Sequence, residues 1–221
     1  MNSVHVKICG LTDPTQARAV ADMGADAVGM VFAPSKRRIT PEQGAAIVQA
    51  VGETARTVGL FVDASAEEIN AVIEQTSVSR VQLHGDESPD IIAEIAVPCW
   101  KVFHVGDENF AVEIHDWLVC LPDGVEVEAI LLDTYSPRAA GGTGESFNWN
   151  LVAHLRDEGL LGDLPPIVLA GGLTPGNVAE AIRVVQPSMV DVSSGVESSP
   201  GVKDLLKVRE FLRAAKIAEK P

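Results

Sequence analysis

The sequence is poor in cysteine, in aromatic residues and in positive charge, and each shortage narrows what the protein can be. Three cysteines in 221 residues are too few for a disulfide framework and fit a reducing compartment, so we expect a cytoplasmic protein. No uncharged apolar run reaches the ~18 residues of a membrane-spanning helix. The first residues also lack the basic and apolar regions of a secretory signal. We therefore expect no membrane partner.

Positive charge is outnumbered along the whole chain. Seventeen Lys and Arg residues against 31 Asp and Glu residues give a net charge of −14. Such a surface repels nucleic acid, so we expect no nucleic-acid partner. The aromatic content is only 5%, and we expect the three tryptophans to pack rather than to stack on bases. A small anionic ligand remains compatible with this charge if a few side chains and helix N-termini make one pocket positive.

What the sequence does contain is a regular alternation of strand and helix patterns. Eight short segments, apolar on both faces, suit buried parallel strands, and each is followed by a helical pattern. The eight segments are Val4–Cys9, Asp26–Phe32, Arg56–Val62, Arg80–Leu83, Cys99–Val105, Ala129–Leu132, Pro166–Ala170 and Met189–Val192. No linker or charge run separates them. The chain is therefore predicted to be α/β, a single (β/α)8 TIM barrel over residues 1–221.

Local signals place the starts of several helices. A capping residue followed by proline occurs at Asp13, Thr40, Ser88 and Thr174, and Ser65 begins a capping-box pattern. The last helix is expected over Lys203–Ala218. The rival fold, an open doubly wound sheet, usually carries G-x-G-x-x-G after its first strand. Here that loop reads CGLTDP, with one glycine.

Small and polar residues gather where the predicted strands end, which is the active-site edge of such a barrel. Three glycine-containing loops follow strands six, seven and eight, and their backbone amides are suited to binding phosphate. The residues expected to do so are Gly142, Gly144, Gly171, Gly172, Ser194 and Gly195. We therefore expect a phosphorylated small-molecule ligand. Tight turns alone are the alternative explanation of these glycines.

Four further features near the predicted strand ends contain reactive or charged side chains. Cys9 and Lys7 share strand parity, so both are expected to face the barrel interior, where the lysine would favour a thiolate. Asp133 ends an apolar strand, where its carboxylate either serves the pocket or caps a helix or loop, and the structural alternative for Asp191 is hydrogen bonding to loop amides. The basic run at 36–38 is either an anion clamp or a solvated loop. No H-E-x-x-H, C-x-x-C or similar spacing is present, so no metal is expected.

These residues, taken in order, resemble the phosphoribosylanthranilate isomerase family of tryptophan biosynthesis. The motifs that carry the resemblance span nearly the whole chain. They are Lys7-Ile-Cys-Gly10, Gly24–Gly29, Gly59–Val62, Gln82-Leu-His-Gly85, Leu131-Leu-Asp133, Gly141–Gly144, Phe147-x-Trp149, Leu169–Leu173, Asn177-Val178, Asp191–Glu197, Pro200-Gly201 and Lys203-Asp204. Each motif is weak by itself, and the ordered set is specific. Position 63 is Asp where many members have Asn, which bears only on a minor polar contact.

The resemblance implies an Amadori rearrangement of an aminoaldose to an aminoketose without a cofactor. It assigns Cys9 as general base and Asp133 as general acid. The acid then needs a raised pKa and the base a lowered one. It also assigns the anthranilate carboxylate to Arg37, with Arg38 as the alternative. Lys7, His84 and Asp191 are expected in substrate binding, with Asp191 in a supporting role.

Other functions remain open from the sequence. The related sugar isomerase of histidine biosynthesis performs the same rearrangement, but it has a strand-one aspartate and a two-fold repeat, which this chain lacks. A Schiff-base aldolase would need a lysine at the end of a middle strand. A non-catalytic phosphate-binding barrel would leave Cys9 and Asp133 unexplained. The chain is expected to be a monomer or a homodimer.

Overall fold

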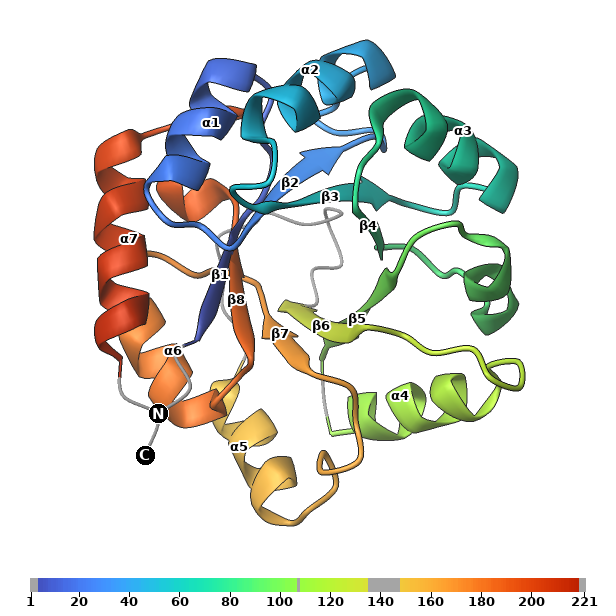
Figure 1. Cartoon of the computed structure of the whole chain (residues 1–221). Helices are drawn as coiled ribbons and strands as arrows, with labels where there is room; N and C mark the ends of the chain where they lie inside the picture. Colours follow the sequence, from blue (N-terminus) through green and yellow to red (C-terminus); the bar gives the residue numbers. More distant parts are fainter. Residues whose placement is uncertain (1–3, 107, 135–147, 219–221) are drawn as a thin grey trace.

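A computed structural model describes residues 4–106, 108–134 and 148–218, which form a closed parallel barrel surrounded by helices (Figure 1). Each strand pairs with the next, and the last pairs with the first to close the ring. The strands are β1 (His5–Ile8), β2 (Ala27–Val31), β3 (Arg56–Phe61), β4 (Arg80–Leu83), β5 (Cys99–Val105), β6 (Ala129–Thr134), β7 (Ile167–Leu169) and β8 (Met189–Val192). The predicted barrel is confirmed.

The outer layer is mostly helical. Its α-helices are α1 (Pro14–Asp22), α2 (Pro41–Val51), α3 (Ala66–Thr76), α4 (Phe110–Val119), α5 (Trp149–Asp157), α6 (Val178–Val185) and α7 (Leu205–Ile217). Two 3-10 helices, η1 (Pro89–Glu94) and η2 (Ser194–Val196), and a hairpin of β9 (Glu197–Ser199) and β10 (Val202–Lys203) complete the described elements. In the part of the chain described here, no helix is long and apolar enough to cross a membrane.

Local capping decides where three of the helices begin. Asp13 accepts a hydrogen bond from the Gln16 amide at 2.8 Å, and Thr40 and Ser65 form reciprocal capping boxes. These starts agree with the prediction because the partners lie within one turn of the chain.

One predicted helix begins as expected but is of another type, and two others begin later than predicted. Ser88 precedes a 3-10 helix and makes no capping hydrogen bond through its side chain. The α6 helix starts at Val178 rather than after Thr174, whose amide donates to Asn177 Oδ1 at 2.7 Å. The last helix starts after Asp204, because Lys203 belongs to the β9–β10 hairpin. The apolar sequence around Cys120 favours a core position, but the residue is exposed at the end of α4.

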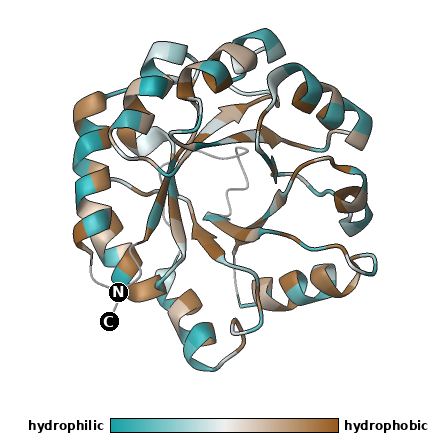
Figure 2. Ribbon diagram, in the orientation of Figure 1, coloured by the Kyte–Doolittle hydropathy of each residue, from teal (hydrophilic) through white to brown (hydrophobic). Residues whose placement is uncertain are grey.

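Two apolar layers hold the barrel together. One lies between the strands and the helices, and Figure 2 shows hydrophobic colour along the strands while the outer helices alternate between the two colours. The other fills the barrel itself, with Trp100 its largest side chain. Alternate residues of each strand face these two layers. Toward the strand ends, inward positions become polar: Lys7, Gln82 and Asp191 are all buried.

Candidate active site

A pocket opens where the strands end, and its lining combines apolar side chains with a few polar and charged ones, as is typical of small-molecule sites. Most of the residues expected at the site line it: Cys9, Arg37, His84, Asp133, Gly171, Gly172, Asp191, Ser194 and Gly195. Gln82, to which the sequence assigned no role, lines it too. Gly142 and Gly144 lie outside the described residues. The structure therefore brings together, from distant parts of the chain, the groups that the sequence predicted to meet.

Lys7 lies beneath this pocket with no exposed surface. Strand pairing places it beside Asp191, and its Nζ lies 2.7 Å from Asp191 Oδ2 and 2.9 Å from Gln82 Oε1. Burial disfavours the ammonium, but the charges of Asp191 and Cys9 outweigh burial and hold the pKa of Lys7 above its ordinary value. The structural alternative for Asp191, hydrogen bonding to loop amides, is wrong, because the recorded partner of Asp191 is this lysine.

Cys9 comes directly after β1 and is held by its own backbone, whose amide donates to Val192 O at 2.8 Å. A glycine on the neighbouring strand makes room for the side chain. A Cβ at Gly29 would lie 2.7 Å from Cys9 Sγ and 3.1 Å from Lys7 Cε. Burial raises the pKa of the Cys9 thiol, and Lys7 opposes burial without cancelling it. This direction is opposite to the lowered pKa that the proposed base requires.

Asp133 is the penultimate residue of β6, and both of its carboxylate oxygens have a polar neighbour. Oδ1 accepts from the Thr134 amide at 2.8 Å, and Oδ2 lies 3.3 Å from His84 Nε2, without the alignment of a full hydrogen bond. Burial opposes ionisation, but the His84 imidazole, the Thr134 amide and the charge of His104 outweigh burial and hold the pKa of Asp133 below its ordinary value. The raised pKa expected of a general acid is not present in the ligand-free protein.

Gln82 connects Lys7 with His84, and through His84 with Asp133. Its Nε2 lies 2.9 Å from His84 Nδ1, while its Oε1 accepts from Lys7. One chain of polar contacts thus crosses the barrel from β8 through β1 and β4 to β6. The residues are Asp191, Lys7, Gln82, His84 and Asp133, and we call this chain the polar file. The motif Gln82-Leu-His-Gly85 contained the signal, because residues two apart on a strand face the same side.

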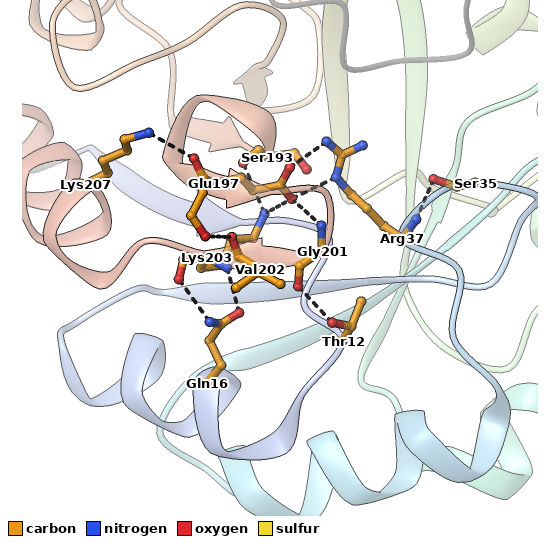
Figure 3. Close-up of polar contacts among 11 residues, drawn as sticks. Thr12, Gln16, Ser35, Arg37, Ser193, Glu197, Gly201, Val202, Lys203 and Lys207 are labelled. Carbon is orange, nitrogen blue, oxygen red and sulfur yellow. Dashed lines mark hydrogen bonds and ion pairs between the residues drawn. The ribbon is translucent and has the colours of Figure 1, made fainter.

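A second polar cluster surrounds Glu197 at the start of β9 (Figure 3). Arg37, in the loop after β2, donates to both Glu197 oxygens at 2.8 and 2.7 Å. Lys203 Nζ adds a contact of 2.8 Å and the Gly201 amide one of 3.2 Å. Glu197 is buried, and burial raises its pKa, but Arg37 and Lys203 outweigh burial and leave that pKa lowered. We call Arg37, Glu197, Gly201 and Lys203 the Glu197 cluster.

The structure distinguishes between Arg37 and Arg38, the two candidates that the sequence offered for binding a carboxylate. Arg37 is half-buried and lines the pocket, whereas Arg38 is exposed and does not line it. Glu197 and Lys203 lie in motifs of the resemblance, but no role had been assigned to either. A run of three basic residues does not reveal which member meets a distant carboxylate.

The loops after β7 and β8 pack closely against each other at the pocket edge. Gly171 and Gly172 have φ angles of +82° and +62°, which favour glycine. A Cβ on Gly195 would overlap the carbonyl oxygen of Leu173, so side chains larger than hydrogen are excluded there. Asn177 braces the first loop by donating to Gly172 O at 3.0 Å. Within residues 4–106, 108–134 and 148–218, no three His, Cys, Asp or Glu side chains are placed to hold a metal ion.

Comparison with known proteins bears on this geometry. The family model described as N-(5'phosphoribosyl)anthranilate (PRA) isomerase matches residues 6–214. The N-(5'-phosphoribosyl)anthranilate isomerase of Trichlorobacter lovleyi is 46% identical over 216 residues, covering 97% of this chain and 99% of that protein.

Solved structures of the same kind of enzyme also match the fold of this chain. The phosphoribosyl anthranilate isomerase of Thermotoga maritima matches with a TM-score of 0.84 and 38% identity, over 96% of this chain and 98% of that one. Another phosphoribosyl anthranilate isomerase, solved with reduced 1-(o-carboxyphenylamino)-1-deoxyribulose 5-phosphate, matches with a TM-score of 0.81 and 37% identity over the same shares. The pocket, the fold and these matches together show that the chain belongs to the N-(5'-phosphoribosyl)anthranilate isomerase family.

Proposed function

We propose that this chain converts N-(5-phosphoribosyl)anthranilate into 1-(2-carboxyphenylamino)-1-deoxyribulose 5-phosphate, an isomerisation in tryptophan biosynthesis, with Cys9 as general base and Asp133 as general acid. One observation carries the proposal: a thiol and a carboxyl group from different strands line the same pocket. Neither group is needed for a barrel that only binds phosphate.

Asp133 would act first. Its proton goes to the ring oxygen O4′ of the ribose, and the C1′–O4′ bond breaks with its electron pair on oxygen. The anthranilate nitrogen then shares its lone pair with C1′, which gives an open-chain iminium. A carboxyl group at the end of β6 suits this step because it is anchored on a rigid strand and reaches the pocket.

Cys9 would act second. Its thiolate removes the proton from C2′, the C–H electron pair forms a C1′=C2′ double bond, and the nitrogen regains its lone pair. The resulting enolamine loses its O2′ proton and gains one at C1′, which yields the ketone. The nearby iminium and the buried Lys7 ammonium both favour the thiolate.

Proton counting connects this scheme with the ligand-free pKa directions. A neutral thiol and an ionised carboxylate hold the same number of protons as a thiolate and a carboxylic acid. The directions of the two pKa shifts therefore agree with the state left after the chemical step, when Asp133 has given up its proton and Cys9 has taken one. Each turnover then requires one proton to leave Cys9 and one to reach Asp133 before the next.

The rest of the pocket would bind the two ends of the substrate. Arg37, aligned by Glu197, is proposed to hold the anthranilate carboxylate. The amides of Gly172, Ser194 and Gly195 are proposed to hold the phosphate, supported by the close backbone approach of the two loops. Gly142, Gly144 and Gly171 remain proposed contacts on the same ligand. Lys7, beneath the pocket floor, is proposed to support Cys9 rather than to touch substrate.

A fluorescence assay on freshly prepared phosphoribosylanthranilate tests the function. We expect this chain alone to abolish the anthranilate-type fluorescence of the substrate. If fluorescence persists while the reduced product analogue binds, the chain is a binding barrel and the proposal fails. Turnover of only the corresponding aminoaldose of histidine biosynthesis would reassign the substrate.

A further inference from the structure

The polar file has a direction that follows from its chemistry. The Lys7 ammonium only donates hydrogen bonds, so the Gln82 atom facing it at 2.9 Å is the oxygen Oε1. The amide nitrogen of Gln82 must then face His84 Nδ1, 2.9 Å away. Because an amide N–H donates, Nδ1 has to accept, and the ring proton of a neutral His84 resides on Nε2. That nitrogen lies 3.3 Å from Asp133 Oδ2.

From this direction we infer that Gln82 is a positioning residue, which keeps His84 as the neutral Nε2–H imidazole so that a proton taken up by the His84–Asp133 pair resides on the Asp133 carboxyl group. The inference rests on the proposed function in one respect, the use of that carboxyl proton in catalysis. The hydrogen-bond direction itself stands on the protein alone.

Two arrangements compete when the pair takes up a proton. In one, His84 becomes an imidazolium beside a carboxylate; in the other, the imidazole stays neutral beside a carboxylic acid. An imidazolium carries N–H at both nitrogens, so its Nδ1–H would face the N–H of Gln82. Rotating the Gln82 amide would remove that clash but would turn its NH2 group toward the Lys7 ammonium. The Gln82 and Lys7 side chains are almost wholly buried, so water does not separate the opposed N–H groups in either orientation of the Gln82 amide.

Groups on the neighbouring elements do not reverse this preference. The charged and titratable residues around the pair are Lys7 on β1, His104 and Lys101 on β5, Asp86 and Glu87 after β4, and Asp191 on β8. His104 stands edge-on with its ring centre 5.6 Å from that of His84, and burial together with His84 lowers its pKa. Lys101 is paired with Glu87 at 2.8 Å and Asp191 with Lys7, so the nearby charges are largely matched.

This arrangement reduces the difference between the lowered pKa of Asp133 and the protonated carboxyl group that the proposed acid needs. The depression of the Asp133 pKa draws partly on positive charge at His84. A neutral ring supplies only the weaker dipole of its N–H bond, so the carboxyl group binds a proton more readily. The direction of the polar file therefore weakens one of the interactions that lower the Asp133 pKa, through a residue that does not itself react.

Two matched variants separate this role from packing. Gln82→Glu keeps the shape but places an acceptor opposite Nδ1, so we expect an imidazolium at His84 at pH 7 and a kcat about 100-fold lower, with KM changed less than about threefold. Gln82→Met removes donor and acceptor together while filling the space. We expect its His84 to stay neutral and its kcat to fall about tenfold or less.

The state of the ring is read without substrate, by 15N NMR of histidine-labelled protein. The chain has five histidines, and the His84 signals are identified by their loss in His84→Asn. We expect the unmodified chain to show a neutral ring protonated at Nε2. A ring protonated at Nδ1, an imidazolium at pH 7, or equal kcat in the two Gln82 variants would overturn the inference. Absence of turnover in the unmodified chain would instead count against the proposed function, because the spectrum does not depend on it.

Discussion

Two groups of buried charges share the pocket edge, and they are partnered in opposite ways. In the polar file each side chain contacts one or two others in sequence, from Asp191 through Lys7 to Asp133. In the Glu197 cluster a single carboxylate receives donors from Arg37, Lys203 and the Gly201 amide. The polar file has Asp191 and Asp133 at its two ends, and both line the pocket. In the Glu197 cluster, both oxygens of the central carboxylate already accept hydrogen bonds.

The two arrangements suit different tasks: one holds a charged side chain in place, and the other allows a carboxyl group to change its protonation. A carboxylate with several buried donors is held in one position and stays ionised, so it suits the orientation of Arg37. A chain of single contacts fixes the direction of each hydrogen bond but leaves Asp133 free to change its protonation. We therefore expect substitutions in the polar file to change kcat, and substitutions in the Glu197 cluster to change stability and KM.

The largest effect is expected at the two groups that we propose to react, Cys9 and Asp133. Cys9→Ser and Asp133→Asn should each lower kcat by at least about 100-fold, the usual contribution of a general acid or base. Steady-state kinetics measures the loss. Cys120→Ser, which changes an exposed cysteine, serves as the control and should leave kcat unaltered. Near-normal turnover in either variant would remove that residue from the mechanism.

The next effect concerns the centre of the Glu197 cluster. Glu197→Gln leaves Arg37 and Lys203 facing a neutral amide, so we expect the free energy of unfolding to fall by about 1–3 kcal/mol. Urea denaturation measures it. The control is Asp22→Asn, which removes the carboxylate of an exposed ion pair with Arg18 and should cost less than about 1 kcal/mol. Equal losses in the two variants would contradict the special position of Glu197.

Arg37 should affect binding more than chemistry. Arg37→Ala should raise KM about tenfold with little change in kcat, because it removes one charged hydrogen-bonding group that acts before and during the reaction. Arg38→Ala should leave both constants near normal, since Arg38 does not line the pocket. The opposite pattern would transfer the carboxylate contact to Arg38.

The smallest effect is a pH dependence of stability. The pKa of Glu197 is lowered on folding, so its contribution is complete above the unfolded pKa of about 4.3 and disappears as pH falls through the folded value. Glu87 behaves in the same direction because of Lys101. We expect Tm to drop between pH 5 and 3, and the drop in Glu197→Gln to be smaller by a few °C. An identical drop in both proteins would remove Glu197 as a source.

The sequence by itself determined the barrel and the location of the site, because both depend on short-range patterns. Alternating apolar segments predict the eight strands, and capping at Asp13, Thr40 and Ser65 acts within a single turn. Strand ends meet at one edge in any parallel barrel. The motif order was sufficient for the family resemblance that the comparisons confirm.

Only the tertiary structure decided which charges meet and in which protonation state. Asp191 reaches Lys7 across 184 positions and Arg37 reaches Glu197 across 160, and no local pattern encodes such pairs. Lys203 likewise lies in the β9–β10 hairpin and not in a helix, and its ammonium group contacts Glu197 there. Burial and partner charge set the pKa directions of Cys9 and Asp133 against the expectation from their roles. These quantities are properties of packed neighbours, and packing exists only after the barrel closes.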